Sequence, residues 1–390
     1  RMNMDQGDYA GLRDFFDRYE KSYVVEKLRA DWIRWLGKRS NWNEIDSEFP
    51  RMIAPEPDVT CYSQQARLAR NDRSVLDEAE KLWLTQLEAP EACRPVLEAL
   101  VASQRLTAED VWTRARRQVE ANRPGQAKAT FNYLPDSQMP DFRAFDSAIN
   151  SGMGYLARQP GNWHSSRGGR EVAAIAIQRI ALNDPRVAAD ELDKLKGRMQ
   201  ESERQWAWGQ IGLQGAKKHL PEAVGWYAGA GKAPLSDDAY QWKVRAALRA
   251  QEWGVVRDTI LAMPPSLAAL PEWTYWLGRA HKAGGRSTEA DALFEKIAGQ
   301  PNFYGNLADE ELGRNIMPPP KAKSPTAEEQ KAARDNPGIR RALAFFRLEM
   351  RTEAVKEWNW SLRGMDDREL LAAANLARGN QIWDRAINTA

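Results

Sequence analysis

The chain is 390 residues long, carries 56 Lys and Arg against 54 Asp and Glu, and is 43% hydrophobic. A net charge of +2 gives no sign of the clustered positive charge with which proteins bind nucleic acid or anionic membranes, so we expect neither as a partner. Apolar runs fall far short of the ~20 residues that span a bilayer, so we expect no transmembrane segment. Length and apolar content suit either two domains or an elongated array of repeats.

The first clear elements are two helices that form a hairpin over Cys61–Gln86. Ala66 and Ala69 are small positions on the first helix, and Asn71-Asp72 forms the turn. The second helix has an apolar face made by Leu76, Ala79, Leu82 and Trp83.

Cys61 and Cys93 are the only two cysteines of the sequence. Cys61 stands at the start of the hairpin and Cys93 just past its end. Because antiparallel helices bring such ends together, the sequence favours a disulfide between them, and with it an oxidising compartment. Two unrelated thiols in a cytosolic protein are the alternative.

Two sharper helix signals follow in the middle of the chain. Thr107 to Asp110 is close to a capping box and precedes apolar residues with helical spacing. Gly168-Gly169 precede a strongly apolar helix over Arg170–Leu182. Asp184 then caps the next helix, and Pro185 occupies its first position, where a missing N–H costs nothing.

Breaks between helices recur every ~12–18 residues, which indicates stacked helix pairs. The clearest pair is Trp273–Pro301, where Gly278 lets two helices approach closely and Phe294 fills the space beyond them. These offsets match the TPR pattern, although His281 stands where an aromatic residue is usual. Degenerate copies of the pair cover two earlier segments, Trp206–Trp226 and Trp242–Trp253.

The 16 Trp residues are an unusual number for a chain of this length. Trp fills the gap between packed helices well, so we interpret most of them as packing residues. A sugar-stacking surface is the alternative for the few that are exposed.

The segment Met317–Pro325 is rich in proline and cannot be helical, because proline lacks a donor and restricts its neighbour. It is typical of an extended linker. We therefore predict a superhelical TPR-like domain over 1–315, a linker over 316–332 and a small helical linker domain over 333–390. Arg1 opens the chain without a leader, and we expect the first domain to lack some helices at its N-terminus.

A search for catalytic, cofactor or metal-binding motifs assigns no residue to such a site. His164, His219 and His281 lie far apart without metal-ligand spacing, which favours surface or packing roles. Gly231-Lys232 resembles a phosphate loop only in part, because Trp226 replaces its first glycine. Acidic pairs at helix starts complement the helix dipole, as at Glu109-Asp110 and Asp366-Asp367.

Three ordered sets of residues match the pattern of one known family. The hairpin carries Cys61-Tyr62-Ser63 and Glu91-Ala92-Cys93, the later pair carries Glu272 to Trp276, and the tail carries Glu357-Trp358 and Asn380 to Asp384. Taken together and in this order, they resemble the superhelical and linker domains of soluble lytic transglycosylases. The resemblance extends over nearly the whole chain.

The resemblance implies a fold, an activity and a compartment. The fold is all-α, a right-handed TPR-like superhelix of the α-solenoid type, ring-like, with a small helical linker domain. The proteins of this family are periplasmic enzymes that cleave the MurNAc–GlcNAc bond of peptidoglycan to 1,6-anhydro products without a cofactor. One glutamic acid protonates the leaving oxygen. Peptidoglycan glycan strands, and other cell-wall enzymes, are the expected partners.

The catalytic stretch of that family has only a partial counterpart here. Gln200-Glu201-Ser202 and Gly212-Leu213-Gln214 resemble it, but their spacing is too short and no Ala-Tyr-Asn follows. Charged neighbours place Glu201 on a solvated helix face. We therefore assign no catalytic residue and interpret the chain as the non-catalytic scaffold of a lytic transglycosylase, inactive alone. The alternative is a stand-alone TPR-like interaction scaffold without enzymatic activity.

Overall fold

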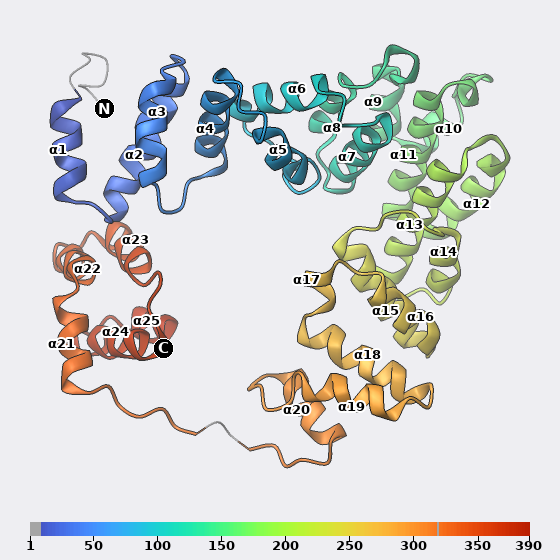
Figure 1. Ribbon diagram of the computed structural model, residues 1–390. Coiled ribbons are helices and arrows are strands. Elements are labelled where there is room, and N and C mark those ends of the chain that lie inside the picture. Colours follow the sequence, from blue (N-terminus) through green and yellow to red (C-terminus); the bar gives the residue numbers. More distant parts are fainter. Residues whose placement is uncertain (1–8, 318–319) are drawn as a thin grey trace. The chain divides into compact units, whose positions relative to one another are not determined.

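The computed structural model describes residues 9–317 and 320–390 (Figure 1). Within these ranges the chain forms 25 α-helices joined by turns and short 3-10 segments, and no strand. The prediction of an all-helical fold is therefore confirmed. Predictions that concern residues 1–8 and 318–319 lie outside the described residues.

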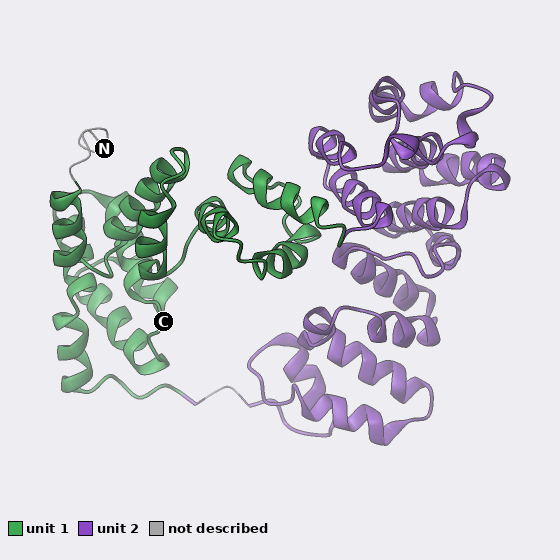
Figure 2. Cartoon of the chain, turned by 45° about the horizontal axis from the view of Figure 1, so that its top comes forward, with its two compact units in different colours: residues 1–105, 321–390 green, residues 106–320 purple. Residues whose placement is uncertain are grey.

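Contacts divide the chain into two compact units, one of residues 1–105 with 321–390 and one of residues 106–320 (Figure 2). The predicted ring-like closure concerns how these units are placed, and it stays a prediction. The domain boundaries predicted at residues 315 and 332 divide the sequence, whereas the two units are defined by contacts in space. The predicted boundaries therefore stay a prediction as well. Helix α21 (Ala327–Asp335) begins inside the predicted linker, where Thr326 forms a capping box with Glu329.

The first unit contains six helices from the N-terminal part of the chain and five from its end. The former are α1 (Ala10–Arg18), α2 (Tyr23–Gly37), α3 (Trp42–Glu48), α4 (Pro57–Ala69), α5 (Val75–Trp83) and α6 (Arg94–Ala102). The latter are α21, α22 (Pro337–Arg347), α23 (Arg351–Ser361), α24 (Asp367–Gly379) and α25 (Trp383–Thr389).

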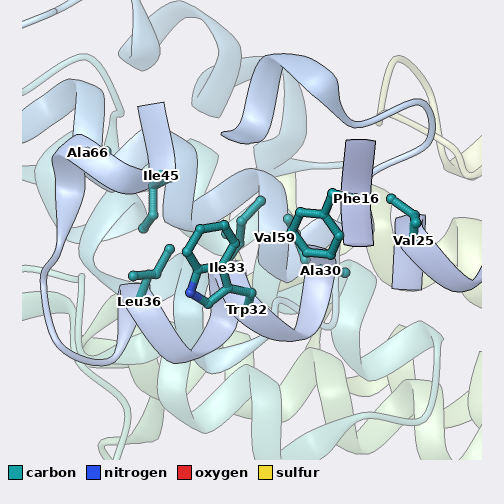
Figure 3. Close-up of a cluster of buried hydrophobic side chains, with 9 residues drawn as sticks. All are labelled: Phe16, Val25, Ala30, Trp32, Ile33, Leu36, Ile45, Val59 and Ala66. Atoms are coloured by element: carbon teal, nitrogen blue, oxygen red, sulfur yellow. The ribbon is translucent and has the colours of Figure 1, made fainter. Parts of the chain in front are cut away.

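Helices α1 to α4 enclose a core of fully buried side chains (Figure 3). Trp32 and Ile33 of α2 lie at its centre. The cluster comprises Phe16, Val25, Ala30, Trp32, Ile33, Leu36, Ile45, Val59 and Ala66. Burial of this apolar surface is the main term that stabilises these helices, since each is too short to be stable alone.

Helix α23, from the last part of the chain, contacts the start of α2 inside the first unit. Glu357 on α23 accepts a hydrogen bond from the backbone N–H of Tyr23 at 3.2 Å and a second one from Arg341. The indole Nε1 of Trp360 donates to the carbonyl of Lys21 at 2.9 Å. Trp360 also packs edge-on against Tyr23, with ring centroids 5.9 Å apart. The last helices are thereby fixed to the start of α2.

The second unit is a succession of helices that pack mainly on their neighbours in sequence. Its helices are α7 (Ala108–Glu120), α8 (Pro124–Phe131), α9 (Phe142–Asn150), α10 (Gly152–Leu156), α11 (Arg167–Asn183), α12 (Pro185–Leu195), α13 (Glu201–Lys217), α14 (Ala223–Gly229), α15 (Asp237–Ala250), α16 (Trp253–Leu261), α17 (Pro265–Ala268), α18 (Pro271–Ala283), α19 (Ser287–Glu295) and α20 (Phe303–Glu311). Packing between sequential pairs is the arrangement expected of a solenoid.

Glycine against an aromatic ring is the repeated contact between paired helices of this unit. A Cβ on Gly278 of α18 would lie 2.5 Å from the ring of Phe294 on α19. A Cβ on Gly212 of α13 would lie 2.8 Å from the ring of Tyr227 on α14. Both rings are buried, so the close approach needs glycine. The predicted role of Gly278 and Phe294 is confirmed.

The helix starts follow the local signals with one exception. Thr107 and Asp110 form the expected capping box, and Asp184 accepts from the N–H of Val187 with Pro185 in the first turn. The expectation that Gly168-Gly169 precede their helix is wrong. Ser166 caps α11 instead, and Gly169 lies inside it, where a Cβ would meet the carbonyl of Trp163 at 2.0 Å.

We predict that Gly278→Ala destabilises the second unit by about 1–3 kcal/mol, because the added methyl group overpacks the buried ring of Phe294. Urea unfolding followed by tryptophan fluorescence measures the change. Gly254→Ala on α16 is the matched control, since no atom lies within 4 Å of its Cβ position. Equal unfolding midpoints for the two variants would contradict the packing argument.

Candidate functional site

Cys61 and Cys93 form a disulfide, with their Cα atoms 4.9 Å apart. Cys61 lies on α4, and Cys93 ends the 3-10 turn that precedes α6. Gln65 supports the same junction by donating from Nε2 to the carbonyl of Ala92 at 2.6 Å. The predicted pairing is confirmed, and the alternative of two unrelated thiols is wrong.

Replacing both cysteines, as Cys61→Ala with Cys93→Ala, is expected to lower the free energy of unfolding of the first unit. The bond closes a loop between residues 32 positions apart, for which chain entropy gives roughly 3–4 kcal/mol. Thermal unfolding of the oxidised, reduced and double-variant forms measures the change. Equal melting temperatures for all three forms would show that the bond adds nothing to stability.

The residues weighed from sequence as acids or metal ligands do not converge. Glu201 is exposed at the first turn of α13, where it accepts from Gln205 at 2.6 Å, so the predicted solvated face is confirmed. His164 and His219 are exposed, whereas His281 is half-buried, and burial lowers its pKa. In the described ranges, no three His, Cys, Asp or Glu side chains gather as metal ligands.

Buried carboxylates occur instead where α7, α11 and α13 meet. Glu171 is fully buried and accepts two hydrogen bonds from Arg116, at 2.9 and 2.6 Å. Burial raises the pKa of Glu171, and the charge and hydrogen bonds of Arg116 oppose that rise. Glu203 accepts from Arg170 at 3.0 Å. Sequence reasoning did not find these pairs, because their partners lie 55 and 33 positions apart.

Glu120, at the end of α7, is a third such carboxylate, with a side chain only 11% exposed. It accepts from Trp206 Nε1 at 2.7 Å and from Gln210 Nε2 at 2.8 Å, and it pairs with Arg117. Burial raises the pKa of Glu120 as well. A general acid must be free to reach a substrate, whereas these carboxylates are occupied by donors from adjacent helices. Their arrangement suits helix attachment.

Because Arg116 and Glu171 form a buried pair, we predict that single and double substitutions of the pair change the unfolding free energy differently. Arg116→Met leaves the carboxylate of Glu171 buried without its main partner, and we expect a loss of about 3–5 kcal/mol in unfolding free energy. Removing both charges, as Arg116→Met with Glu171→Leu, is expected to recover most of this loss. Urea unfolding of the three proteins measures both effects. A double variant less stable than the single one would contradict a mainly structural pair.

A pocket of about 520 Å³ opens between α13, α15, α18 and α20. Its lining contains Trp242 and Arg245 of α15 and Trp276 of α18. The guanidinium of Arg245 lies 5.2 Å from the ring centroid of Trp242 and also 5.2 Å from that of Trp273. We refer to these residues and their neighbours as the aromatic–arginine pocket; its remaining lining residues are Ala216, His219, Leu248, Arg249, Glu272 and Tyr304.

The sequence predicts the helix pairs that contribute to this pocket, but it does not predict the pocket itself. The pairs begin at Trp242 and Trp273, and sugar stacking is the alternative role for exposed Trp. The spacing of Trp242 and Arg245 places them on one helix face. Only the packing of α15 beside α18 shows that Trp276 lies across from them.

None of the described helices combines the length and apolar character that crossing a membrane requires.

Comparison with known proteins gives a consistent result. Residues 332–390 match the soluble lytic murein transglycosylase L domain. The soluble lytic murein transglycosylases of Escherichia coli K12 and O157:H7 are each 21% identical over 374 residues, which is 92% of this chain. The chain spans 56% of the length of these curated relatives.

Solved structures of the same family have a similar fold. The lytic transglycosylase Slt of Pseudomonas aeruginosa, solved as an inactive mutant, is 25% identical, with a TM-score of 0.68 over 97% of this chain and 62% of the other. The 70 kDa soluble lytic transglycosylase of Escherichia coli is 20% identical, with a TM-score of 0.57 over 99% of this chain and 63% of the other.

The all-helical fold and the match of residues 332–390 to an L domain place the chain beside one class of proteins, the soluble lytic transglycosylases. Within that class, the chain is similar to the soluble lytic murein transglycosylases. The relationship predicted from the residues is confirmed.

Proposed function

We propose that this chain is the non-catalytic scaffold region of a periplasmic lytic transglycosylase, an enzyme that cleaves the MurNAc–GlcNAc bond of peptidoglycan to 1,6-anhydro products. The observation that carries the proposal is the ordered likeness to soluble lytic transglycosylases over 97% of the chain, together with the L domain at residues 332–390. Peptidoglycan glycan strands are the proposed substrate of the whole enzyme, and other cell-wall enzymes are further partners.

The carboxylates support a scaffold role rather than a catalytic one. Glu171, Glu203 and Glu120 are each held by an arginine of the same or a neighbouring helix. Glu201 is exposed, whereas a general acid of this kind is buried. We therefore propose that the catalytic acid belongs to another part of the whole enzyme.

The compartment and the domain division follow as parts of the same proposal. The disulfide between Cys61 and Cys93 favours an oxidising compartment, which the periplasm is. We propose the superhelical domain over 1–315, the linker over 316–332 and the small helical domain over 333–390. The absence of assigned secondary structure over 314–317 and 320–326 supports a linker in this region.

The test compares this 390-residue chain with the full-length product of its gene, which we propose is a longer protein, each incubated with purified peptidoglycan. We expect the longer protein to release 1,6-anhydro-muropeptides and this chain to release none. Mass spectrometry of the soluble products measures the release, and the Escherichia coli enzyme is the positive control.

Two other outcomes would count against the proposal in different ways. Anhydro-products released by this chain alone would mean that it contains a catalytic acid. No release by the longer protein would favour the alternative, a stand-alone TPR-like scaffold without enzymatic activity.

A further inference from the structure

We propose that the aromatic–arginine pocket binds a short stretch of acidic glycan, that is, N-acetylated pyranose rings of which at least one carries a carboxylate. The chemical class of this ligand rests on the proposed function. The pocket geometry described below supports it from residues that the proposed function does not use.

The aromatic side chains of this pocket differ from those that only fill the core. Trp32, Trp112 and Trp358 are completely buried between helices. Trp242 and Trp276, by contrast, are half-buried and line an open cavity of about 520 Å³. This volume lies within the range of ~300–1,000 Å³ that is typical of ligand pockets. A partly exposed indole offers an apolar platform for the C–H face of a sugar ring.

A polar atom in the same pocket lacks a partner. Trp273 is 2% exposed, and its indole Nε1 has no hydrogen-bond acceptor. Leaving a buried donor unsatisfied costs about 1–3 kcal/mol, so such groups usually have a partner. Trp206, by contrast, donates to Glu120, whereas Trp32 and Trp112 in the core also have no acceptor. The missing acceptor of Trp273 therefore does not by itself set this pocket apart.

The two arginines of the pocket lack the carboxylate partners that several other arginines of the unit have. Arg116, Arg170 and Arg186 all pair with glutamates. Within the described part of the chain, neither Arg245 nor Arg249 has an ion-pair partner. Arg245 is held by its stacking on two indoles, which leaves the N–H groups at the edge of the guanidinium free to donate.

The charges of the lining residues indicate the sign of the ligand's charge. Arg245 and Arg249 face a single acid, Glu272, so the pocket is positive at neutral pH. An arginine fork binds a carboxylate through two parallel hydrogen bonds, which gives direction as well as affinity. Glu272 can accept from a sugar hydroxyl or amide N–H. Stacking platforms beside unpaired arginines therefore fit a sugar acid better than a neutral sugar.

The test measures binding by the 390-residue chain with isothermal titration calorimetry. The probes are the tetrasaccharide of alternating GlcNAc and MurNAc, which carries lactyl carboxylates, and chitotetraose, which is neutral and of equal length. We expect the acidic probe to bind about 10-fold or more tightly than the neutral one, the range that one charge-assisted pair supplies.

Two sets of variants distinguish the contribution of stacking to the binding affinity from that of charge. Arg245→Gln with Arg249→Gln is expected to remove the preference for the acidic probe over chitotetraose. Trp242→Ala is expected to weaken both probes about 10-fold or more. Matched controls are Trp383→Ala and Arg340→Gln, which alter exposed residues outside this pocket and should change neither affinity. Circular dichroism and urea unfolding verify that each variant is folded.

Several outcomes would overturn this inference without touching the proposed function. Among them are the absence of binding to either probe, equal affinity for both, and equal losses in the pocket and control variants. Binding of an acidic peptide or a nucleotide in preference to both sugars would assign the pocket to another ligand. Conversely, this chain could bind the acidic probe selectively while the longer protein shows no lytic activity. That result would refute the proposed function and leave this inference standing.

Discussion

The constraint on which this structure depends is the distance between paired helices. At Gly212 and Gly278 an aromatic ring of the next helix occupies the space where a Cβ would stand. A glycine opposite a large ring lets two short helices exclude water along their whole contact, although neither would be stable alone. The same chemistry repeated from pair to pair produces a continuous core from elements that contact mainly their neighbours.

Such packing leaves polar groups at the helix junctions that must be satisfied, and the chain uses charged pairs for this purpose. Two hydrogen-bonded pairs connect α7 to its neighbours in buried surroundings. Arg116 bonds to Glu171 of α11, and Glu120 bonds to Trp206 of α13. Breaking one partner would leave a charge without compensation, so these pairs fix the register of one helix on the next. They also explain why buried glutamates here do not indicate catalysis.

The aromatic–arginine pocket departs from this pattern in a way that suggests recognition. Trp242 and Trp276 are only partly covered, and Arg245 stacks on two indoles where other arginines pair with a carboxylate. The first unit carries a different feature, since Glu357 and Trp360 fasten the L domain to the start of α2.

The sequence by itself determined the helices with their caps at Thr107 and Asp184 and the glycine–aromatic pair of Gly278 and Phe294. It also favoured the disulfide and carried the likeness to soluble lytic transglycosylases. These follow from local backbone preferences and short spacings that one stretch of chain carries alone. Only the tertiary structure decided which indoles stay partly exposed, which acids pair with an arginine, and that α23 is attached at Lys21 and Tyr23. These depend on contacts between residues far apart in sequence, whose partners no local pattern identifies.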